Sequence, residues 1–217
     1  MRNGQGWRRI GWRGVLHCVI MQTLFLMEFP MKFKVILVSA LLTASAMVHA
    51  ADFQLGSPEI KAGSLIDKRF EFNGFGCSGD NKSPALEWRN APAGTQSFAI
   101  TVHDPDAPTG SGWWHWSVIN LPATVNSLPA DAGALGDANL PTGARQVRID
   151  YGVAAWGGVC PPPGDKAHRY IFTIYALKTP KLDIPADATA ALAGYMINAN
   201  TIGKASFVAR YGRPKAK

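Results

Sequence analysis

Hydrophobic and polar residues alternate in short segments over most of the chain, and turn-forming residues separate these segments. Clusters such as Asn73-Gly74 and Pro161-Pro162-Pro163-Gly164 supply the turns. A period of two between such clusters is typical of β-strands. The pattern predicts an all-β or β-rich fold with one sheet or a pair of sheets. The predicted strands are residues 69–72, 85–88, 98–103, 114–121, 146–149, 170–177 and 205–211.

One segment departs from the period of two. Leu192, Tyr195 and Met196 fall at helical spacing, and Asp187 is a residue type that caps helices. The segment predicts one short helix at about residues 188–198.

Residues 31–50 have the three parts of a secretory signal peptide. Met31-Lys32-Phe33-Lys34 is basic, residues 35–42 are apolar, and small residues lead to Ala50. A membrane anchor needs roughly 20 apolar residues, which is more than this run supplies. We expect cleavage after Ala50 and a periplasmic or secreted product that does not span the membrane, with residues 51–217 as a single domain.

Residues 1–30 precede a second methionine, which stands where a signal peptide should begin. We interpret them as an upstream extension from a start codon placed too early. The alternative is a real cationic leader before two short hydrophobic segments.

Net charge does not indicate a nucleic-acid partner. Residues 1–50 hold six of the 22 basic residues and one of the 15 acidic residues, so the rest carries 16 basic and 14 acidic residues, a formal net charge of +2. The basic residues are scattered apart from a small cluster at the C-terminus.

Cys77 and Cys160 are the two cysteines that remain after signal cleavage, because Cys18 lies in the removed segment. An exported protein matures in an oxidising compartment, so this even pair predicts a disulfide. The alternative is two buried free thiols.

Two carboxylates follow the apolar segment 98–103. Asp104 and Asp106 flank Pro105, and Pro108 follows. Proline fixes its own φ and keeps the preceding residue out of the helical region, so both carboxylates are held in an extended or turn backbone. The alternative is a strand-ending turn with exposed acids. A tight turn between two prolines also predicts a cis Ala107-Pro108 bond.

His115 lies among Trp113, Trp114 and Trp116. Regular alternation would place His115 on the face opposite Trp114 and Trp116. A histidine in an apolar strand is often a hydrogen-bonded core residue, and the tryptophans could form an exposed platform. We favour at least two of them in the core.

A third polar stretch completes a resemblance to a known family. The segments Asp104-Pro105-Asp106-Ala107-Pro108 and Trp113-Trp114-His115-Trp116 resemble one signature of the phosphatidylethanolamine-binding proteins, and Pro161-Pro162 with His168-Arg169-Tyr170 resembles the other. Ser83-Pro84-Ala85-Leu86-Glu87-Trp88 and Gly194-Tyr195-Met196 are similar to the bacterial Raf-kinase-inhibitor-like branch, the YbhB/YbcL branch. The resemblance spans nearly all of residues 52–210.

The resemblance implies a β-sandwich with one or two short peripheral helices and a pocket for phosphate-like or head-group-like anions. The implied ligand-binding residues are Asp104, Asp106, His115, Pro162, His168 and Tyr170. It implies a non-enzymatic binding module without a cofactor, and it makes a homodimer plausible. No segment after Tyr211 matches the C-terminal aromatic segment of the animal members, and nothing marks a kinase-docking surface.

The residues themselves suit an anion pocket, because imidazole and tyrosine hydroxyl can donate while carboxylates orient the histidines. Two such histidines should bind an anion more tightly as the pH falls through roughly 6.5, the ordinary imidazole pKa.

The sequence also leaves a competing function and two weaker signals. The competing function is a hydrolase, which would either depend on a metal ion or use Asp104 and His168 as acid and base. His103 could contribute to such a metal site, which would consist of two histidines and one carboxylate. No metal-ligand spacing supports the metal site, and no G-x-S-x-G motif supports a serine hydrolase. Residues 74–79 spell G-x-G-x-x-G, but no helix is predicted after them, which argues against a dinucleotide site.

Overall fold

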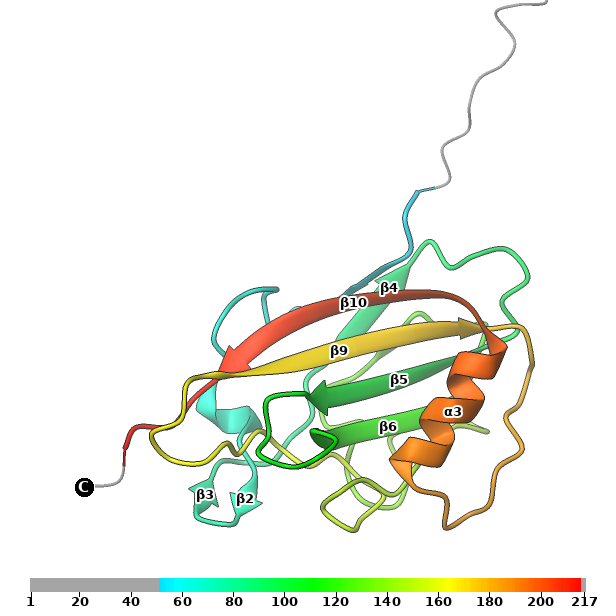
Figure 1. Ribbon diagram of the computed structural model, residues 1–217. Helices are drawn as coiled ribbons and strands as arrows, with labels where there is room; N and C mark the ends of the chain where they lie inside the picture. The colour runs from blue at the N-terminus through cyan, green and yellow to red at the C-terminus, as the bar shows by residue number, and fades with distance from the viewer. Residues whose placement is uncertain (1–50, 216–217) are drawn as a thin grey trace, which may run out of the picture. The chain divides into compact units, whose positions relative to one another are not determined.

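The computed structural model describes residues 51–215, which form a β-sandwich with one α-helix. The larger sheet has the order β10-β9-β5-β6-β8, and every neighbouring pair is antiparallel. Its strands are β5 (Ser97–Asp104), β6 (Trp113–Pro122), β8 (Arg145–Gln146), β9 (His168–Leu177) and β10 (Thr201–Tyr211). The smaller sheet has the order β1-β4-β7, with β1 (Gln54–Gly56), β4 (Leu86–Arg89) and β7 (Ser127–Leu128). The all-β prediction is confirmed (Figure 1).

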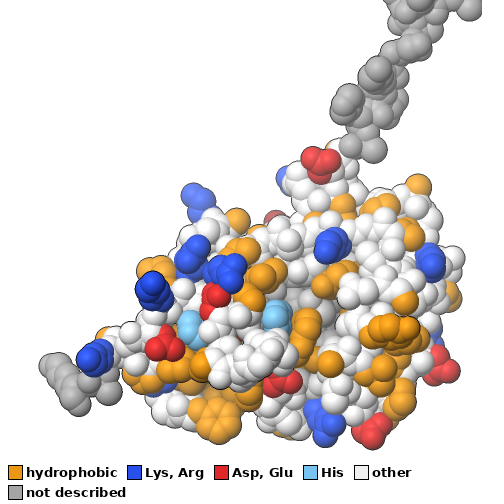
Figure 2. All heavy atoms as spheres, in the orientation of Figure 1, with side chains coloured by type: hydrophobic (Ala, Val, Ile, Leu, Met, Phe, Trp, Pro, Cys, Tyr) orange, Lys and Arg blue, Asp and Glu red, His pale blue; other side chains and the backbone are white. Residues whose placement is uncertain are grey.

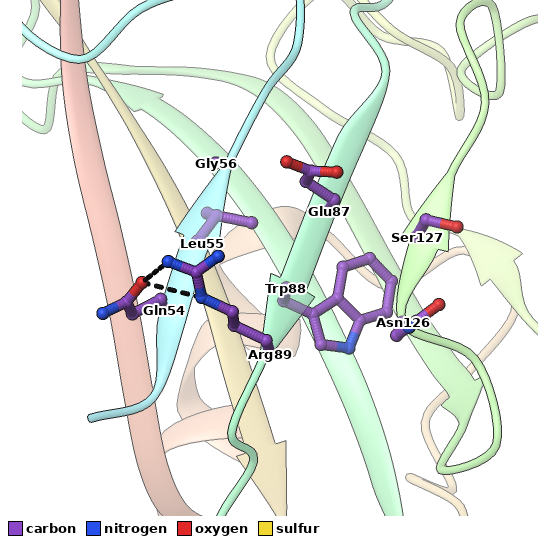
Figure 3. Close-up of a pocket in the computed structure, with 8 residues that line it drawn as sticks. All are labelled: Gln54, Leu55, Gly56, Glu87, Trp88, Arg89, Asn126 and Ser127. Atoms are coloured by element: carbon purple, nitrogen blue, oxygen red, sulfur yellow. Dashed lines mark hydrogen bonds between the residues drawn. The ribbon is translucent and has the colours of Figure 1, made fainter. Parts of the chain in front are cut away.

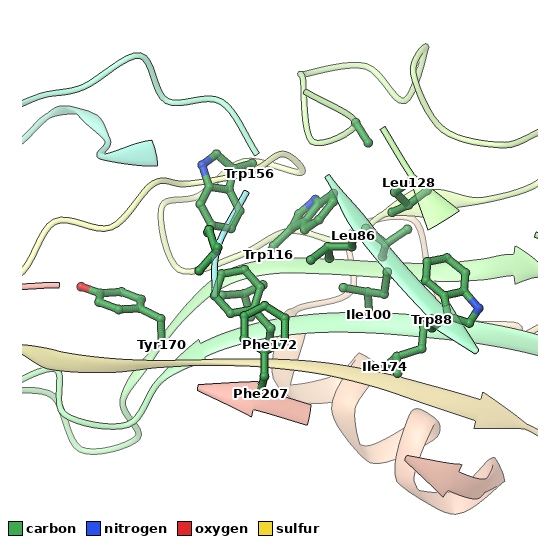
Figure 4. Close-up of a cluster of buried hydrophobic side chains, with 14 of the residues drawn as sticks. Leu86, Trp88, Ile100, Trp116, Leu128, Trp156, Tyr170, Phe172, Ile174 and Phe207 are labelled. Atoms are coloured by element: carbon green, nitrogen blue, oxygen red, sulfur yellow. The ribbon is translucent and has the colours of Figure 1, made fainter. Parts of the chain in front are cut away.

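The main hydrophobic core lies between the two sheets. Along β5, Phe98, Ile100 and Val102 alternate toward it, which is the period of two that the sequence pattern predicts. The rings of Phe172 on β9 and Phe207 on β10 stack at a centroid distance of 4.7 Å. Figure 4 labels part of this core: Leu86, Trp88, Ile100, Trp116, Leu128, Trp156, Tyr170, Phe172, Ile174 and Phe207.

Helix α3 (Ala190–Asn200) covers the other face of the larger sheet. The helix was predicted in the right place, but its cap and its buried face were wrong. Thr189 rather than Asp187 is the N-cap, because its hydroxyl accepts from the backbone N–H of Leu192. The buried positions include Ala193 and Ile197, whereas Tyr195 is 72% exposed. The small alanine side chain allows a close approach to the sheet.

The predicted strand at residues 69–72 is also wrong. Lys68–Phe70 forms a 3-10 helix, because the Asp67 side chain accepts from the backbone N–H of Arg69 and starts a tight turn. After this turn comes a short hairpin of β2 (Asn73–Gly74) and β3 (Cys77–Ser78), with Phe75 at its tip.

The proposed signal peptide, residues 31–50, and the proposed upstream extension, residues 1–30, lie outside the described residues. Within residues 51–215, no helix is long and apolar enough to cross a membrane.

Candidate ligand-binding site

A cavity of about 230 Å³ lies at the end of the larger sheet where β5 ends and β6 and β9 begin. Four residues of the implied pocket line it: Asp104, His115, Pro162 and His168. The other lining residues are Phe75, Ala107, Pro108, Thr109, Trp113, Tyr151, Cys160 and Pro161. The chain thus brings together side chains that are far apart in sequence, and surrounds Asp104, His115 and His168 with aromatic and proline rings.

An irregular register turns His115 toward this cavity. Val102 on β5 pairs with Trp116 and His103 pairs with Trp114, so His115 is an extra residue on β6, a β-bulge. The His115 ring lies 5.0 Å from the ring of Tyr170, a core residue on the inner face of the sheet. His115 therefore shares the inner face with Trp116, and the prediction that they lie on opposite faces was wrong.

The three tryptophans occupy three different environments. Trp116 is fully buried in the core, Trp113 lines the cavity, and Trp114 packs against His103 on the outer face at a ring distance of 4.3 Å. Only one of the three is fully buried, fewer than we favoured, because the bulge changes which residues face inward.

Two backbone carbonyls fix the tautomer of His115. Its Nδ1 lies 2.7 Å from the oxygen of Gly157 and 3.1 Å from that of Gly158, so Nδ1 carries the hydrogen and donates. Burial lowers the pKa of His115 to about 4, although these carbonyls act in the opposite direction. His115 is therefore neutral at pH 6.5 and is not the group that charges there, in contrast to the expectation from its ordinary pKa.

Asp104 and His168 form a buried pair beside His115. The Asp104 oxygen Oδ2 lies 2.8 Å from His168 Nδ1, and Asp104 Oδ1 accepts from the backbone N–H groups of Asp106 and Ala107 at 2.8 and 3.1 Å. The Asp104 side chain is 3% exposed and that of His168 is 5% exposed. The other ring nitrogen of His168, Nε2, lies 3.6 Å from Asp165.

Asp106 and Tyr170 are not among the lining residues. Asp106 pairs with Arg169, whose Nη2 lies 2.6 Å from Asp106 Oδ1, and this contact lowers the pKa of Asp106 to about 2. Tyr170 is buried behind His115, and its hydroxyl has no hydrogen-bond partner among residues 51–215. These two residues therefore contact residues that line the cavity but do not form its surface.

The two hydrogen bonds that Asp104 Oδ1 accepts explain the trans peptide bond at Ala107-Pro108. No peptide bond in residues 51–215 is cis, so the cis prediction was wrong. Two N–H groups donating to one Asp104 oxygen already define the turn with a trans bond.

Tyr151 was missed by the sequence analysis. Its hydroxyl donates to the oxygen of Gly158 at 3.0 Å, and its ring stacks on Phe72 at 4.3 Å. A side chain at Gly157 would overlap the Tyr151 ring, which accounts for glycine there. Burial raises the pKa of Tyr151 well above its ordinary value. No local motif marks Tyr151, which reaches the site through a loop.

The predicted disulfide between Cys77 and Cys160 is confirmed, with a Cα–Cα distance of 6.0 Å. It joins the β2-β3 hairpin, which carries Phe75, to the segment that carries Pro161 and Pro162. Both segments line the cavity, so the bond connects two of its walls.

A larger cavity, of about 500 Å³, lies far from these residues on the smaller sheet. Figure 3 shows Gln54 on β1 hydrogen-bonded to its neighbour Arg89 on β4, at 2.9 and 2.5 Å, and Glu87 and Ser127 are also among the lining residues. It contains neither histidine nor cysteine and holds none of the implied ligand-binding residues. Its size alone does not make it the functional site.

Among the described residues, no group of three or more His, Cys, Asp and Glu side chains is arranged to hold a metal ion. His103, a candidate metal ligand from its residue type, alternates with the core residue Val102 and so lies on the opposite face of the sheet from His115.

The buried neutral state of His115 predicts that the protein loses stability in mild acid. The unfolded chain takes up this proton near pH 6.5, but the folded chain does so only near pH 4, so the stabilisation is complete above about pH 6.5 and is lost as the pH falls toward 4. We expect the free energy of unfolding to drop by roughly 2–3 kcal/mol from this group. Urea unfolding at pH 7.5 and 4.5 measures it. The variant His115→Asn should show a smaller drop; an equal drop would contradict the assignment.

Comparisons with known proteins agree with this architecture. A family model described as phosphatidylethanolamine-binding protein matches residues 56–212. The UPF0098 protein YbcL of Escherichia coli is 54% identical over 174 residues, which cover 80% of this chain and 94% of YbcL. The UPF0098 protein YbhB of the same organism is 44% identical over 158 residues, covering 73% of this chain and 99% of YbhB.

Solved structures show the same fold. The crystal structure of E. coli YbcL, described as a new member of the mammalian PEBP family, matches with a TM-score of 0.73 at 54% identity, over 75% of this chain and 99% of that one. A putative homologue from Chlamydia trachomatis, CT736, matches with a TM-score of 0.62 at 28% identity, over 75% of this chain and 98% of that one. This chain belongs to the phosphatidylethanolamine-binding protein family, and its similarity to YbcL and YbhB supports a place in their bacterial branch.

Proposed function

We propose that this chain is an exported, non-enzymatic binding module whose cavity holds a small phosphate-like anion. The observation that carries the proposal is the joint placement of Asp104, His115 and His168 in one small cavity. Protonated His168 donates from Nδ1 to Asp104, and its Nε2, 3.6 Å from the exposed carboxylate of Asp165, can donate to a ligand oxygen that replaces this contact.

The surroundings of the cavity favour an anion. Lys166 and Lys215 are exposed in segments next to His168, whereas Arg169 is already paired with Asp106 and Asp165 is exposed in the same segment as Lys166. On the face shown in Figure 2, Lys and Arg side chains gather toward the C-terminal end of the chain, with acidic side chains among them. Such a cluster raises the local concentration of anions, while the buried pair provides the specific contact.

Export is part of the proposal. The signal-peptide pattern of residues 31–50 and the disulfide are both typical of proteins that mature outside the cytoplasm. A relative from Mycobacterium tuberculosis is named putative lipoprotein LppC and is 32% identical over 162 residues, which is consistent with an extracytoplasmic member of the family.

A hydrolase is the second candidate, because the Asp104–His168 pair has the arrangement of an acid–base dyad. The nucleophile would have to be water: Cys160 is in the disulfide, and the Thr109 hydroxyl donates to the Gly112 oxygen. If this candidate were right, the protein would hydrolyse p-nitrophenyl phosphate, and His168→Ala would abolish the activity. We expect no hydrolysis above the rate in buffer.

Calorimetric titration with inorganic phosphate tests the binding proposal. His168→Ala removes the proposed donor, so we expect the affinity to fall by roughly tenfold or more. His103→Ala is the matched control, because it removes a histidine from the opposite face of the same sheet. Circular dichroism should show both variants folded. No binding by the parent protein, or equal weakening in both variants, would contradict the proposal.

A further inference from the structure

Most side chains of the cavity use their hydrogen-bond donors inside the protein; the buried Trp113 Nε1 has no partner among residues 51–215. His115 Nδ1 donates to the carbonyl oxygens of Gly157 and Gly158, and the Tyr151 hydroxyl donates to the same Gly158 oxygen. The Thr109 hydroxyl donates to Gly112. A ligand oxygen therefore finds few free donors on these walls.

What His115 presents to the cavity is an acceptor. Its Nδ1 is directed at the two carbonyls, and its Nε2 makes no hydrogen bond to any residue in 51–215 although the side chain lines the cavity. A neutral imidazole that donates from Nδ1 carries a lone pair on Nε2. An unprotonated oxygen placed against this nitrogen would meet lone pair with lone pair, whereas a hydroxyl would form a hydrogen bond.

The carboxylate of Asp104 favours a monoanion over a dianion. Both of its oxygens already accept hydrogen bonds, from His168 and from two backbone N–H groups, so it offers a ligand negative charge rather than a donor. A second negative charge on the ligand is therefore unfavourable close to this carboxylate.

We propose that the site selects an oxyanion that brings its own proton, such as the monoanion of a phosphate monoester, over an unprotonated oxyanion of the same shape and charge. The P–O–H group donates to His115 Nε2, and another oxygen of the ligand accepts from His168. This inference rests on the proposed function, and it names the class of anion that the cavity accepts.

Several ionisable groups surround His115, and they would respond to pH with any ligand. Asp104 faces it from β5, His168 and Tyr170 from β9, and Tyr151 from the loop before Gly157, while Asp165 lies beside His168. His103, on the outer face, also acts weakly on its charge. A comparison of two ligands at the same pH cancels these contributions.

Methyl phosphate and methyl sulfate form the matched pair of probes. At pH 5 both are monoanions of the same shape, but only methyl phosphate has a hydroxyl hydrogen, because a phosphate monoester loses its second proton near pH 6. His115 is still mainly neutral at pH 5. We expect methyl phosphate to bind at least about tenfold more tightly at pH 5, which is the usual loss for one unmade hydrogen bond in a closed site. By pH 8 this preference should largely disappear.

The variant His115→Asn isolates the acceptor. The asparagine amide nitrogen takes the place of Nδ1 and can still donate to Gly157, but no group takes the place of Nε2. We expect both ligands to bind this variant with nearly equal affinity at pH 5, while His103→Asn keeps the preference.

The outcomes separate the two proposals. If methyl phosphate and methyl sulfate bind the parent protein equally at pH 5, the proton-selection inference is wrong and anion binding stands. If neither binds, the proposed function fails and the inference fails with it. The ligand comparison on the parent protein decides the question even if the His115 variant does not fold.

Discussion

Loss of the Cys77–Cys160 disulfide is expected to lower the free energy of unfolding by roughly 2–5 kcal/mol. The two residues are 83 positions apart, so the bond closes a long loop and restricts the unfolded chain. The expected loss is a large part of the stability of an ordinary domain. Urea unfolding of the oxidised protein and of the double variant Cys77→Ser/Cys160→Ser measures it.

The same disulfide connects two walls of the cavity, so its removal should also disturb the arrangement of the cavity. The control is Ser78→Ala, a neighbouring hairpin substitution that keeps the bond. Reduction of the parent protein should reproduce the destabilisation of the double variant and should leave that variant unchanged. A stability difference below about 1 kcal/mol would mean that the bond contributes little to the fold.

Asp104→Ala is expected to destabilise the protein by roughly 3–5 kcal/mol, the usual cost of breaking a buried charged pair. The carboxylate accepts three hydrogen bonds, and its removal leaves His168 and two backbone N–H groups without their partner. Thermal and urea unfolding at pH 7 give the change in free energy.

Asp104→Asn is the matched variant, because its amide oxygen can still accept from the two backbone N–H groups. We expect a smaller loss of stability and a change of tautomer at His168, since an amide N–H now faces its Nδ1; nitrogen NMR of the histidine side chains reports the tautomer. Equal stability of the alanine variant and the parent would show that the Asp104–His168 pair does not stabilise this end of the sheet.

Much of the fold followed from local pattern because the long strands alternate regularly. β5 keeps an unbroken register with β9, so Phe98, Ile100 and Val102 could be assigned to the core from their spacing alone. The cysteine pair could likewise be predicted, since export and an even count restrict the choices. The family signatures implied six ligand-binding residues, and four of them line the cavity.

The remaining features depend on interactions that spacing does not encode. One extra residue at His115 turns its ring to the inner face, and bulges carry no reliable signal in composition. The acceptor state of His115 depends on the carbonyls of Gly157 and Gly158, more than 40 positions later in the chain. Tyr151 and Phe75 reach the cavity through loops whose course is determined by tertiary contacts.

The distance in sequence between Asp104 and His168 has a practical consequence for finding the natural ligand. Their pairing joins residues 64 positions apart on β5 and β9, so the binding site exists only when the chain has folded and brought these strands together. A ligand that binds only the folded chain stabilises it by about 2.7 kcal/mol when present at one hundred times its Kd. An increase in the Tm of this protein therefore reports the binding of a ligand. A panel of metabolites can be screened by thermal unfolding, without a label, an enzymatic assay or a known partner.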